Sequence, residues 1–288
     1  MRALTTPRRR ACRPLLRRLL RLGGAALIGL ALAPALANDS AAELAIGGLV
    51  LTRSADVAME REDLFISRDK VRVDYVFRNT GERDVETQVA FPLPEIPAAD
   101  ETGYVEELSL DWERPDNPVH FKLWVDGKPA PFETQAEHRP GGVELTFHWL
   151  QRFPKGQAVA IRHEYEPVVG GFVGFCLSPE TVAAYCIEPD LLRWARRHVD
   201  KDAPLVPQCG AYVGTVGSSW VHYILTTATS WKGPIGHFRL RVRKDDPREL
   251  VSFCGEGVRK LDARTFVMEK TDYVPQQDLR VLYLIPHE

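Results

Sequence analysis

The segment around Trp231 carries the residue types best suited to gripping a ligand. Trp231 and Lys232 stand before a Gly-Pro pair that ends in Pro234, between two stretches of alternating apolar residues. A tryptophan beside such a turn offers a rigid aromatic edge for a peptide or a sugar. The other interpretation is that Trp231 closes one end of a β-sandwich. We therefore take Trp231, Lys232 and Pro234 as the candidate binding edge, with the core interpretation left open.

His163 is the second candidate, as a general base. It shares one face of an expected strand with Val159, Ile161 and Tyr165, so it should point inward. An inward histidine serves either as a base in a cleft or as a hydrogen-bonded core residue.

Charged side chains form two further groups. Segment 95–116 holds eight acidic residues opposed only by Arg114, and carboxylate oxygens suit Ca²⁺, although a solvated acidic loop is the plainer interpretation. Arg239, Arg241 and Arg243 lie on one face of a strand, where they could hold an acidic partner or this acidic loop. Such alternation also marks the wet face of a sheet.

Recognised catalytic motifs are missing from the sequence. There is no Gly-x-Ser-x-Gly elbow, His-Glu-x-x-His pair, Walker loop or calcium loop. Ser67 and Lys70 match Ser-x-x-Lys, but at a turn between strands, where the lysine is not one helical turn from the serine. We expect no catalytic residue, no cofactor and no metal.

Residues 1–37 have the organisation of an export signal. Arginines precede a short apolar run from Leu22 to about Ala33, and Ala35 and Ala37 suit the −3 and −1 positions of a signal peptidase. The run is shorter than the ~20 residues of a membrane-spanning helix. We expect cleavage before Asn38, no membrane span afterwards, and a periplasmic or secreted protein.

Cleavage changes the charge of the chain. The first 37 residues hold eight arginines and no acid, which leaves 29 basic against 39 acidic residues and a formal charge of −10. A negative surface argues against nucleic acid or an anionic membrane as a partner.

Four cysteines remain after Cys12 is removed with the signal, an even number that predicts two disulfides in an oxidising compartment. They are Cys176, Cys186, Cys209 and Cys254. Their spacing leaves all three connectivities open.

The local pattern is mainly that of β-strands. Val71, Val73, Tyr75 and Phe77 alternate with polar residues, and later stretches repeat this period between Gly- and Pro-rich turns. Two helices are expected within 169–215, opened by Ser178-Pro179 and by Pro189. We predict a mainly β protein with two antiparallel β-sandwich-like domains, 38–168 and 216–288, joined by a helical, cysteine-containing segment, 169–215.

Several motifs along the chain resemble an exported bacterial family that is catalogued only as a domain of unknown function. They are Asn38-Asp39-Ser40, Gly47-Gly48-Leu49, Phe91-Pro92-Leu93-Pro94, Tyr185-Cys186-Ile187, Trp231-Lys232-Gly233-Pro234-Ile235-Gly236 and Ser252-Phe253-Cys254-Gly255. The resemblance implies an exported protein and no particular reaction. It also implies a Cys186–Cys254 bridge, which leaves Cys176–Cys209 as the second.

Three function classes follow from these features. The first is a non-catalytic binding or assembly module of the envelope that recognises a protein or an envelope component. The second is a hydrolase acting on envelope carbohydrate or peptide, which would show two carboxylates about 5–10 Å apart in a groove if it were a glycosidase. The third is a purely structural envelope component.

Overall fold

The computed structural model describes residues 40–45, 48–51, 53–97, 110–111, 113–139, 141–200, 209 and 211–287. The expected signal peptide, 1–37, and most of the acidic segment lie outside the described residues. Within the described part, no helix is both long and apolar enough to cross a membrane.

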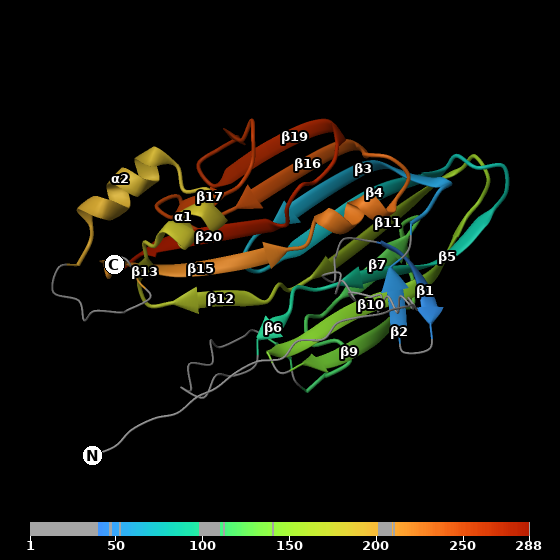
Figure 1. The fold of residues 1–288 in the computed structure, drawn as a ribbon, viewed down its shortest axis with the longest axis horizontal. Coiled ribbons are helices and arrows are strands. Elements are labelled where there is room, and N and C mark those ends of the chain that lie inside the picture. Colours follow the sequence, from blue (N-terminus) through green and yellow to red (C-terminus); the bar gives the residue numbers. More distant parts are fainter. Residues whose placement is uncertain are drawn as a thin grey trace, which may run out of the picture. The chain divides into compact units, whose positions relative to one another are not determined.

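An eight-stranded sheet forms the centre of the fold (Figure 1). Its order is β18-β19-β16-β3-β4-β11-β7-β8. Its strands are β3 (Val57–Ile66), β4 (Val71–Asn79), β7 (Lys122–Val125), β8 (Lys128–Pro129), β11 (Ala158–Tyr165), β16 (Ile235–Arg243), β18 (Arg259–Lys260) and β19 (Thr265–Tyr273).

A six-stranded sheet is built from the N-terminal half of the described chain. Its order is β2-β1-β5-β10-β6, with β9 also paired to β10. Its strands are β1 (Ser40–Ala45), β2 (Gly48–Leu51), β5 (Val85–Pro92), β6 (Ile96–Pro97), β9 (Glu133–Arg139) and β10 (Gly142–Phe153).

A four-stranded sheet and a small two-stranded sheet come from the C-terminal half. The four-stranded sheet has the order β12-β15-β20-β17. These strands are β12 (Val169–Phe172), β15 (Val216–Tyr223), β17 (Leu250–Phe253) and β20 (Leu279–Pro286), and the two-stranded sheet pairs β13 (Phe175–Cys176) with β14 (Tyr212–Val213). The helices are α1 (Pro179–Ala184), α2 (Pro189–Arg197) and the 3₁₀ helix η1 (Thr226–Ser230).

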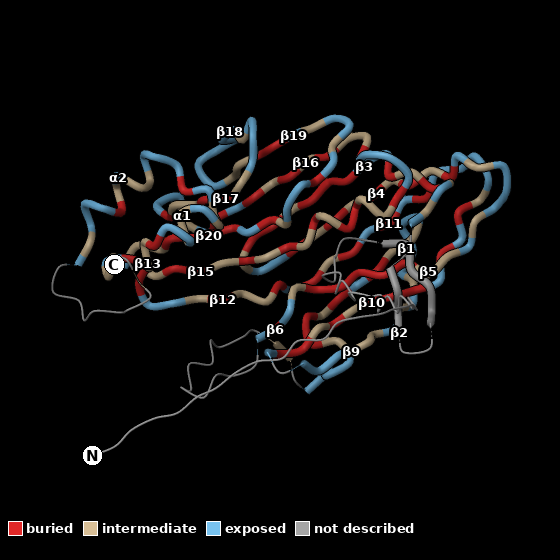
Figure 2. The backbone as a smooth tube through the Cα atoms, in the orientation of Figure 1, coloured by how far each residue is buried: buried red, intermediate tan, exposed pale blue. Residues whose placement is uncertain are grey.

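Alternation in the sequence explains the strands. Along β4, buried and half-buried residues alternate without a break, because successive side chains of a strand point to opposite faces (Figure 2). The Asp126-Gly127 turn between β7 and β8 has positive φ at both residues, 48° and 76°, which is the geometry of a tight hairpin turn.

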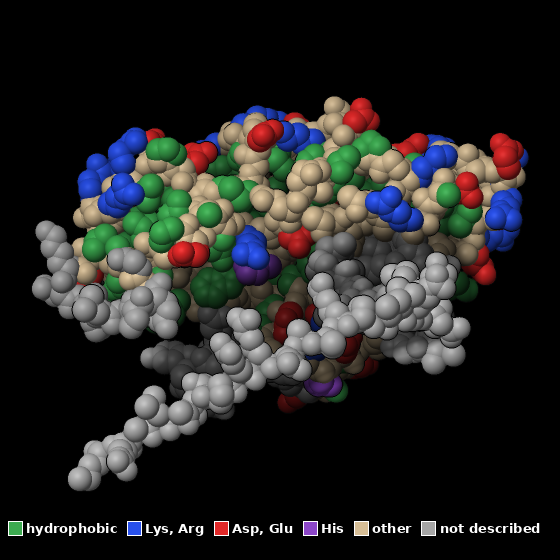
Figure 3. Space-filling model, in the orientation of Figure 1, with side chains coloured by type: hydrophobic (Ala, Val, Ile, Leu, Met, Phe, Trp, Pro, Cys, Tyr) green, Lys and Arg blue, Asp and Glu red, His purple; other side chains and the backbone are tan. Residues whose placement is uncertain are grey.

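Helix starts also follow their sequence signals. The Ser178 hydroxyl accepts a hydrogen bond from the Thr181 amide, as an N-cap does. Helix α2 begins at Pro189, as expected, and basic side chains gather over it on the face seen in Figure 3. Arg196 and Arg197 lie in its last turn, where positive charge suits the helix dipole.

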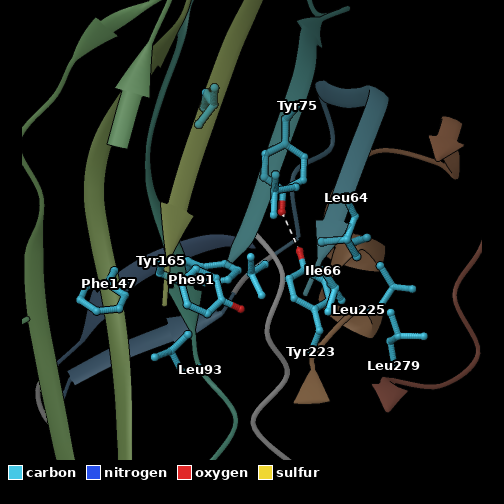
Figure 4. Packing of buried hydrophobic residues seen from close by; sticks show 14 of the residues in the cluster. Leu64, Ile66, Tyr75, Phe91, Leu93, Phe147, Tyr165, Tyr223, Leu225 and Leu279 are labelled. Atoms are coloured by element: carbon cyan, nitrogen blue, oxygen red, sulfur yellow. Dashed lines mark hydrogen bonds between the residues drawn. The ribbon is translucent and has the colours of Figure 1, made fainter. Parts of the chain in front are cut away.

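One hydrophobic core joins the three large sheets. The Phe121 and Phe147 rings stack 4.2 Å apart, which packs the six-stranded sheet against the inner face of the eight-stranded one. The Tyr75 and Tyr223 hydroxyls lie 3.1 Å apart, so the four-stranded sheet packs against the same inner face (Figure 4). The eight-stranded sheet is therefore shared by two smaller sheets.

The mainly β fold is confirmed, but the predicted division into two sandwiches is not. Strand β16 pairs in parallel with β3, so strands from 38–168 and 216–288 share one sheet (Figure 1). Segment 169–215 contains both helices, but it also supplies β12, β13 and β14. Local periodicity identified these strands correctly; the pairing of strands far apart in the chain decides the sheets.

Candidate functional site

A cleft lies between the six-stranded and the four-stranded sheet. It has a volume of about 440 Å³. We call it the junction cleft; its described lining residues are Leu93, Pro94, Glu95, Pro97, Gly141, Tyr165, Val168, Gly170, Trp220 and His222. The first five of these come from the β5–β6 segment and the residue before β10, and the last three from β12 and β15. Its volume falls within the ~300–1,000 Å³ of small-molecule sites.

Tyr165, at the end of β11, lines the cleft and carries a buried hydroxyl. Its side chain lies beside Phe91 and Leu93 (Figure 4), and the residue is only 4% exposed. Among the described residues, the Tyr165 hydroxyl has no hydrogen-bond partner. Burial alone raises the pKa of this phenol, so it stays a neutral donor and acceptor.

Trp220 forms part of the wall on the four-stranded sheet. Strands β12 and β15 pair Gly170 with Trp220, and a Cβ built on Gly170 would come within 2.1 Å of the indole nitrogen. Glycine at this position therefore lets the indole lie directly against the neighbouring backbone. Any larger residue at 170 would displace Trp220 from the cleft wall.

His222 and Glu95 add polar groups to this mainly apolar lining. Burial, and then the charge of Arg280 on the paired strand, lower the pKa of His222 to about 4. His222 is therefore a neutral imidazole near pH 7, and its Nε2 lies 3.4 Å from the Tyr185 hydroxyl. A Cβ on Gly141 would come within 2.8 Å of a Glu95 carboxylate oxygen, so glycine leaves room for that carboxylate.

Replacing His222 with glutamine should make the free energy of unfolding less dependent on pH at acidic pH. The pKa of His222 falls from 6.5 to about 4 on folding, so the unfolded chain takes up a proton first as the pH drops. The contribution of His222 to the free energy of unfolding is complete above pH ~6.5. It is lost, by up to about 3 kcal/mol, as the pH falls to ~4. Urea unfolding of the wild type and His222→Gln between these pH values measures the difference. Equal slopes for the two proteins would show that His222 is protonated at the same pH in both states.

The two cleft residues on β15 were not singled out by the sequence analysis, although a signal was present. Val221 and Tyr223 are fully buried on the inner face of this strand. Trp220 and His222 therefore lie together on the other face of the strand. A tryptophan and a histidine side by side are unusual on a solvent-exposed face.

The structure places the Trp231 side chain in the core. Its side chain is 3% exposed and its ring centroid lies 4.6 Å from that of Phe77 and 5.8 Å from that of Phe153. This position supports the core interpretation of Trp231, because the apolar strands β4 and β10 meet there and the large side chain fills the space between them. Lys232 and Pro234 are exposed, and Lys232 donates to the Thr80 hydroxyl at 2.8 Å.

His163 lies in the core rather than in the junction cleft. It is fully buried, and its ring lies 4.2 Å from Phe91 and 5.3 Å from Phe121. It points inward as expected, and these packed aromatic rings support the core interpretation.

Both expected disulfides are present, Cys186–Cys254 and Cys176–Cys209. The first joins the end of α1 to the residue after β17, and the second joins β13 to Cys209. Among the described side chains, no group of three His, Cys, Asp or Glu residues comes together to hold a metal ion. The described end of the acidic segment binds within the protein, because Asp111 lies 3.1 Å from His120 Nε2.

A family model described as Domain of unknown function (DUF4424) matches residues 37–142 and 141–282 of this chain. The chain belongs to this family. No curated protein matches it. Membership of DUF4424 thus agrees with the resemblance seen in the sequence motifs and assigns no reaction or ligand.

Solved structures resemble this DUF4424 chain at low identity. A candidate nutrient-binding protein of Legionella pneumophila is 17% identical, with a TM-score of 0.46, and the match covers 81% of this chain and 68% of that one. Yeast LTA4 hydrolase in complex with bestatin is 10% identical, with a TM-score of 0.37 over 79% of this chain and 28% of that one. An M1 zinc metallopeptidase of Deinococcus radiodurans is 12% identical, with a TM-score of 0.30 over 80% and 43%.

Proposed function

We propose that this protein is a non-catalytic binding module of the bacterial envelope, and that the junction cleft holds a small neutral ligand. The observation that supports this proposal is Tyr165, which lines the cleft and whose buried hydroxyl has no hydrogen-bond partner among the described residues. A buried hydroxyl without a hydrogen bond costs about 1–3 kcal/mol. A ligand that bonds to Tyr165 would recover that free energy.

The lining indicates the class of ligand. Leu93, Val168 and the prolines provide an apolar surface, and Trp220 provides an aromatic one. Tyr165 and neutral His222 can each donate or accept a hydrogen bond, and the Glu95 carboxylate accepts. An apolar face bordered by hydroxyl groups complements this set, so a neutral mono- or disaccharide is the class that fits best.

The hydrolase alternative receives no comparable support. Among the described lining residues, Glu95 supplies the one carboxyl group, whereas glycoside hydrolysis uses a pair. A purely structural role would leave the unpartnered Tyr165 hydroxyl unexplained.

Export of the protein is part of the proposal. Two disulfides suit an oxidising compartment, and the sequence pattern of 1–37 favours cleavage and release into the periplasm or beyond.

Tyr165→Phe should stabilise the free protein while weakening ligand binding. Removing a buried hydroxyl without a partner should raise the free energy of unfolding by about 1 kcal/mol. Tyr75→Phe is the matched control, because the Tyr75 hydroxyl lies 3.1 Å from that of Tyr223 and its loss should lower stability. Urea unfolding of both variants measures this; a loss of stability in Tyr165→Phe would show that its hydroxyl is already bonded within the protein.

Calorimetric titration with glucose, galactose, mannose, N-acetylglucosamine and maltose tests the ligand class. At least one sugar should bind the wild type, and Trp220→Ala and Tyr165→Phe should weaken that sugar roughly tenfold. Trp124→Ala, which changes a tryptophan outside the junction cleft, should bind like the wild type. Binding that survives Trp220→Ala, or no binding by any of the five sugars, would contradict the proposed ligand class.

A further inference from the structure

The outer face of the eight-stranded sheet carries an excess of guanidinium groups. They surround a hollow of about 620 Å³, separate from the junction cleft. We call it the arginine hollow; its charged lining residues are Arg61, Arg72, Arg162, Arg239, Arg241, Asp63 and Asp74. This set has a formal charge of +3, whereas residues 38–288 together have a formal charge of −10. The hollow is thus a local exception to the acidic character of the chain.

The strand register explains why four of the five arginines form ion pairs. Asp63 on β3 lies directly opposite Asp74 on β4, and like charges across a strand pair repel. Each carboxylate is shared by two arginines, one of them on a neighbouring strand. The ion pairs are Arg61–Asp63, Arg239–Asp63, Arg72–Asp74 and Arg162–Asp74. Each carboxylate with its two arginines therefore keeps a net positive charge.

Arg241 is the arginine that this network does not use. Among the described residues it makes no ion pair, and its Nε has no hydrogen-bond partner. Its guanidinium carbon lies 5.9 Å from the centre of the Phe65 ring. Burial, followed by the charges of Arg239 and Arg72, lowers the pKa of Arg241, which means that the positive charge of Arg241 is itself disfavoured at this position. An anion bound beside Arg241 would stabilise this positive charge.

We propose that the arginine hollow binds the phosphoryl group of an organic phosphate, held by Arg241 together with Arg239 and Arg72. Planar guanidinium groups bind phosphate oxygens through paired hydrogen bonds. The hollow is larger than a phosphoryl group requires, and Trp124 lies on its wall opposite Arg162 on β11. The indole provides a surface for the organic part of the ligand.

Calorimetric titration of the full chain with inorganic phosphate and with glycerol 3-phosphate tests this site. Both should bind, with a Kd of about 1 mM or lower at low salt, and Arg241→Gln should weaken both roughly tenfold. Arg243→Gln is the matched control: it removes the same charge from the same strand, but Arg243 pairs with Asp69 and does not line the hollow. The control should stay within about twofold of the wild type.

Vesicles containing phosphatidylglycerol identify the source of the phosphoryl group. If the wild type sediments with these vesicles and Arg241→Gln does not, the phosphoryl group belongs to a lipid headgroup. Binding of glycerol 3-phosphate without vesicle binding assigns it to a soluble phosphate. The proposal is overturned if the wild type binds neither phosphate compound, or if Arg241→Gln binds them as tightly as Arg243→Gln.

Discussion

Loss of the Cys186–Cys254 disulfide is expected to lower the free energy of unfolding by about 4 kcal/mol. The two cysteines are 68 residues apart, and in the chain-entropy model a cross-link that closes a loop of this length raises the free energy of the unfolded chain by roughly this much, because it removes conformational entropy. Cys186→Ser or Cys254→Ser should each show the loss in urea unfolding under oxidising conditions. Sugar binding in the junction cleft should persist below the unfolding transition, because neither cysteine lines it.

The backbone at Cys186 provides a sharper comparison. Cys186 follows the last turn of α1 with φ of 47°, and the Ile187 amide donates to the Val182 carbonyl at 3.0 Å. This helix ending normally uses glycine, because a side chain in the left-handed region costs about 1 kcal/mol or more. Cys186→Gly should therefore be about 1 kcal/mol more stable than Cys186→Ser, although both lose the disulfide. Equal stability of the two variants would show that the cross-link alone, and no backbone strain, decides the effect.

Trp231→Ala is expected to destabilise the protein by about 3–5 kcal/mol, the usual cost of removing a buried tryptophan. The ring fills the space between Phe77 and Phe153, so alanine would leave a cavity lined by aromatic side chains. Lys232→Ala is the neighbouring control; its side chain is exposed, and we expect a change within about 0.5 kcal/mol.

Thermal and urea unfolding of both variants distinguish the core role of Trp231 from a binding role. Full stability of Trp231→Ala would contradict its place in the core. A binding edge would instead predict normal stability with a loss of ligand affinity.

The sequence predicts those parts of the fold that depend on local patterns. Alternation identifies β4 because each inward side chain is apolar, and Ser178 identifies the start of α1 because its hydroxyl caps the helix. The parallel pairing of β16 with β3 has no local signal. It depends on which sheet edges are free after the intervening strands have paired.

The junction cleft shows the same limit. The sequence places Tyr165 on an inward face, but only the meeting of three sheets leaves its hydroxyl without a partner among the described residues. The conformation of Cys186 is likewise invisible in the sequence, because a cysteine in a left-handed position is held there by its tertiary contacts.

Native mass spectrometry of the full protein isolated from a bacterial periplasm tests most directly whether the junction cleft is a ligand site. The wild type should carry a small neutral molecule that is lost on denaturation, and the denatured mass should equal residues 38–288 less the four hydrogens removed by two disulfides. Tyr165→Phe and Trp220→Ala, prepared in parallel, should carry markedly less of that molecule. Equal occupancy in all three proteins, or a wild type without a bound molecule even after addition of the five sugars, would show that the junction cleft is not a ligand site.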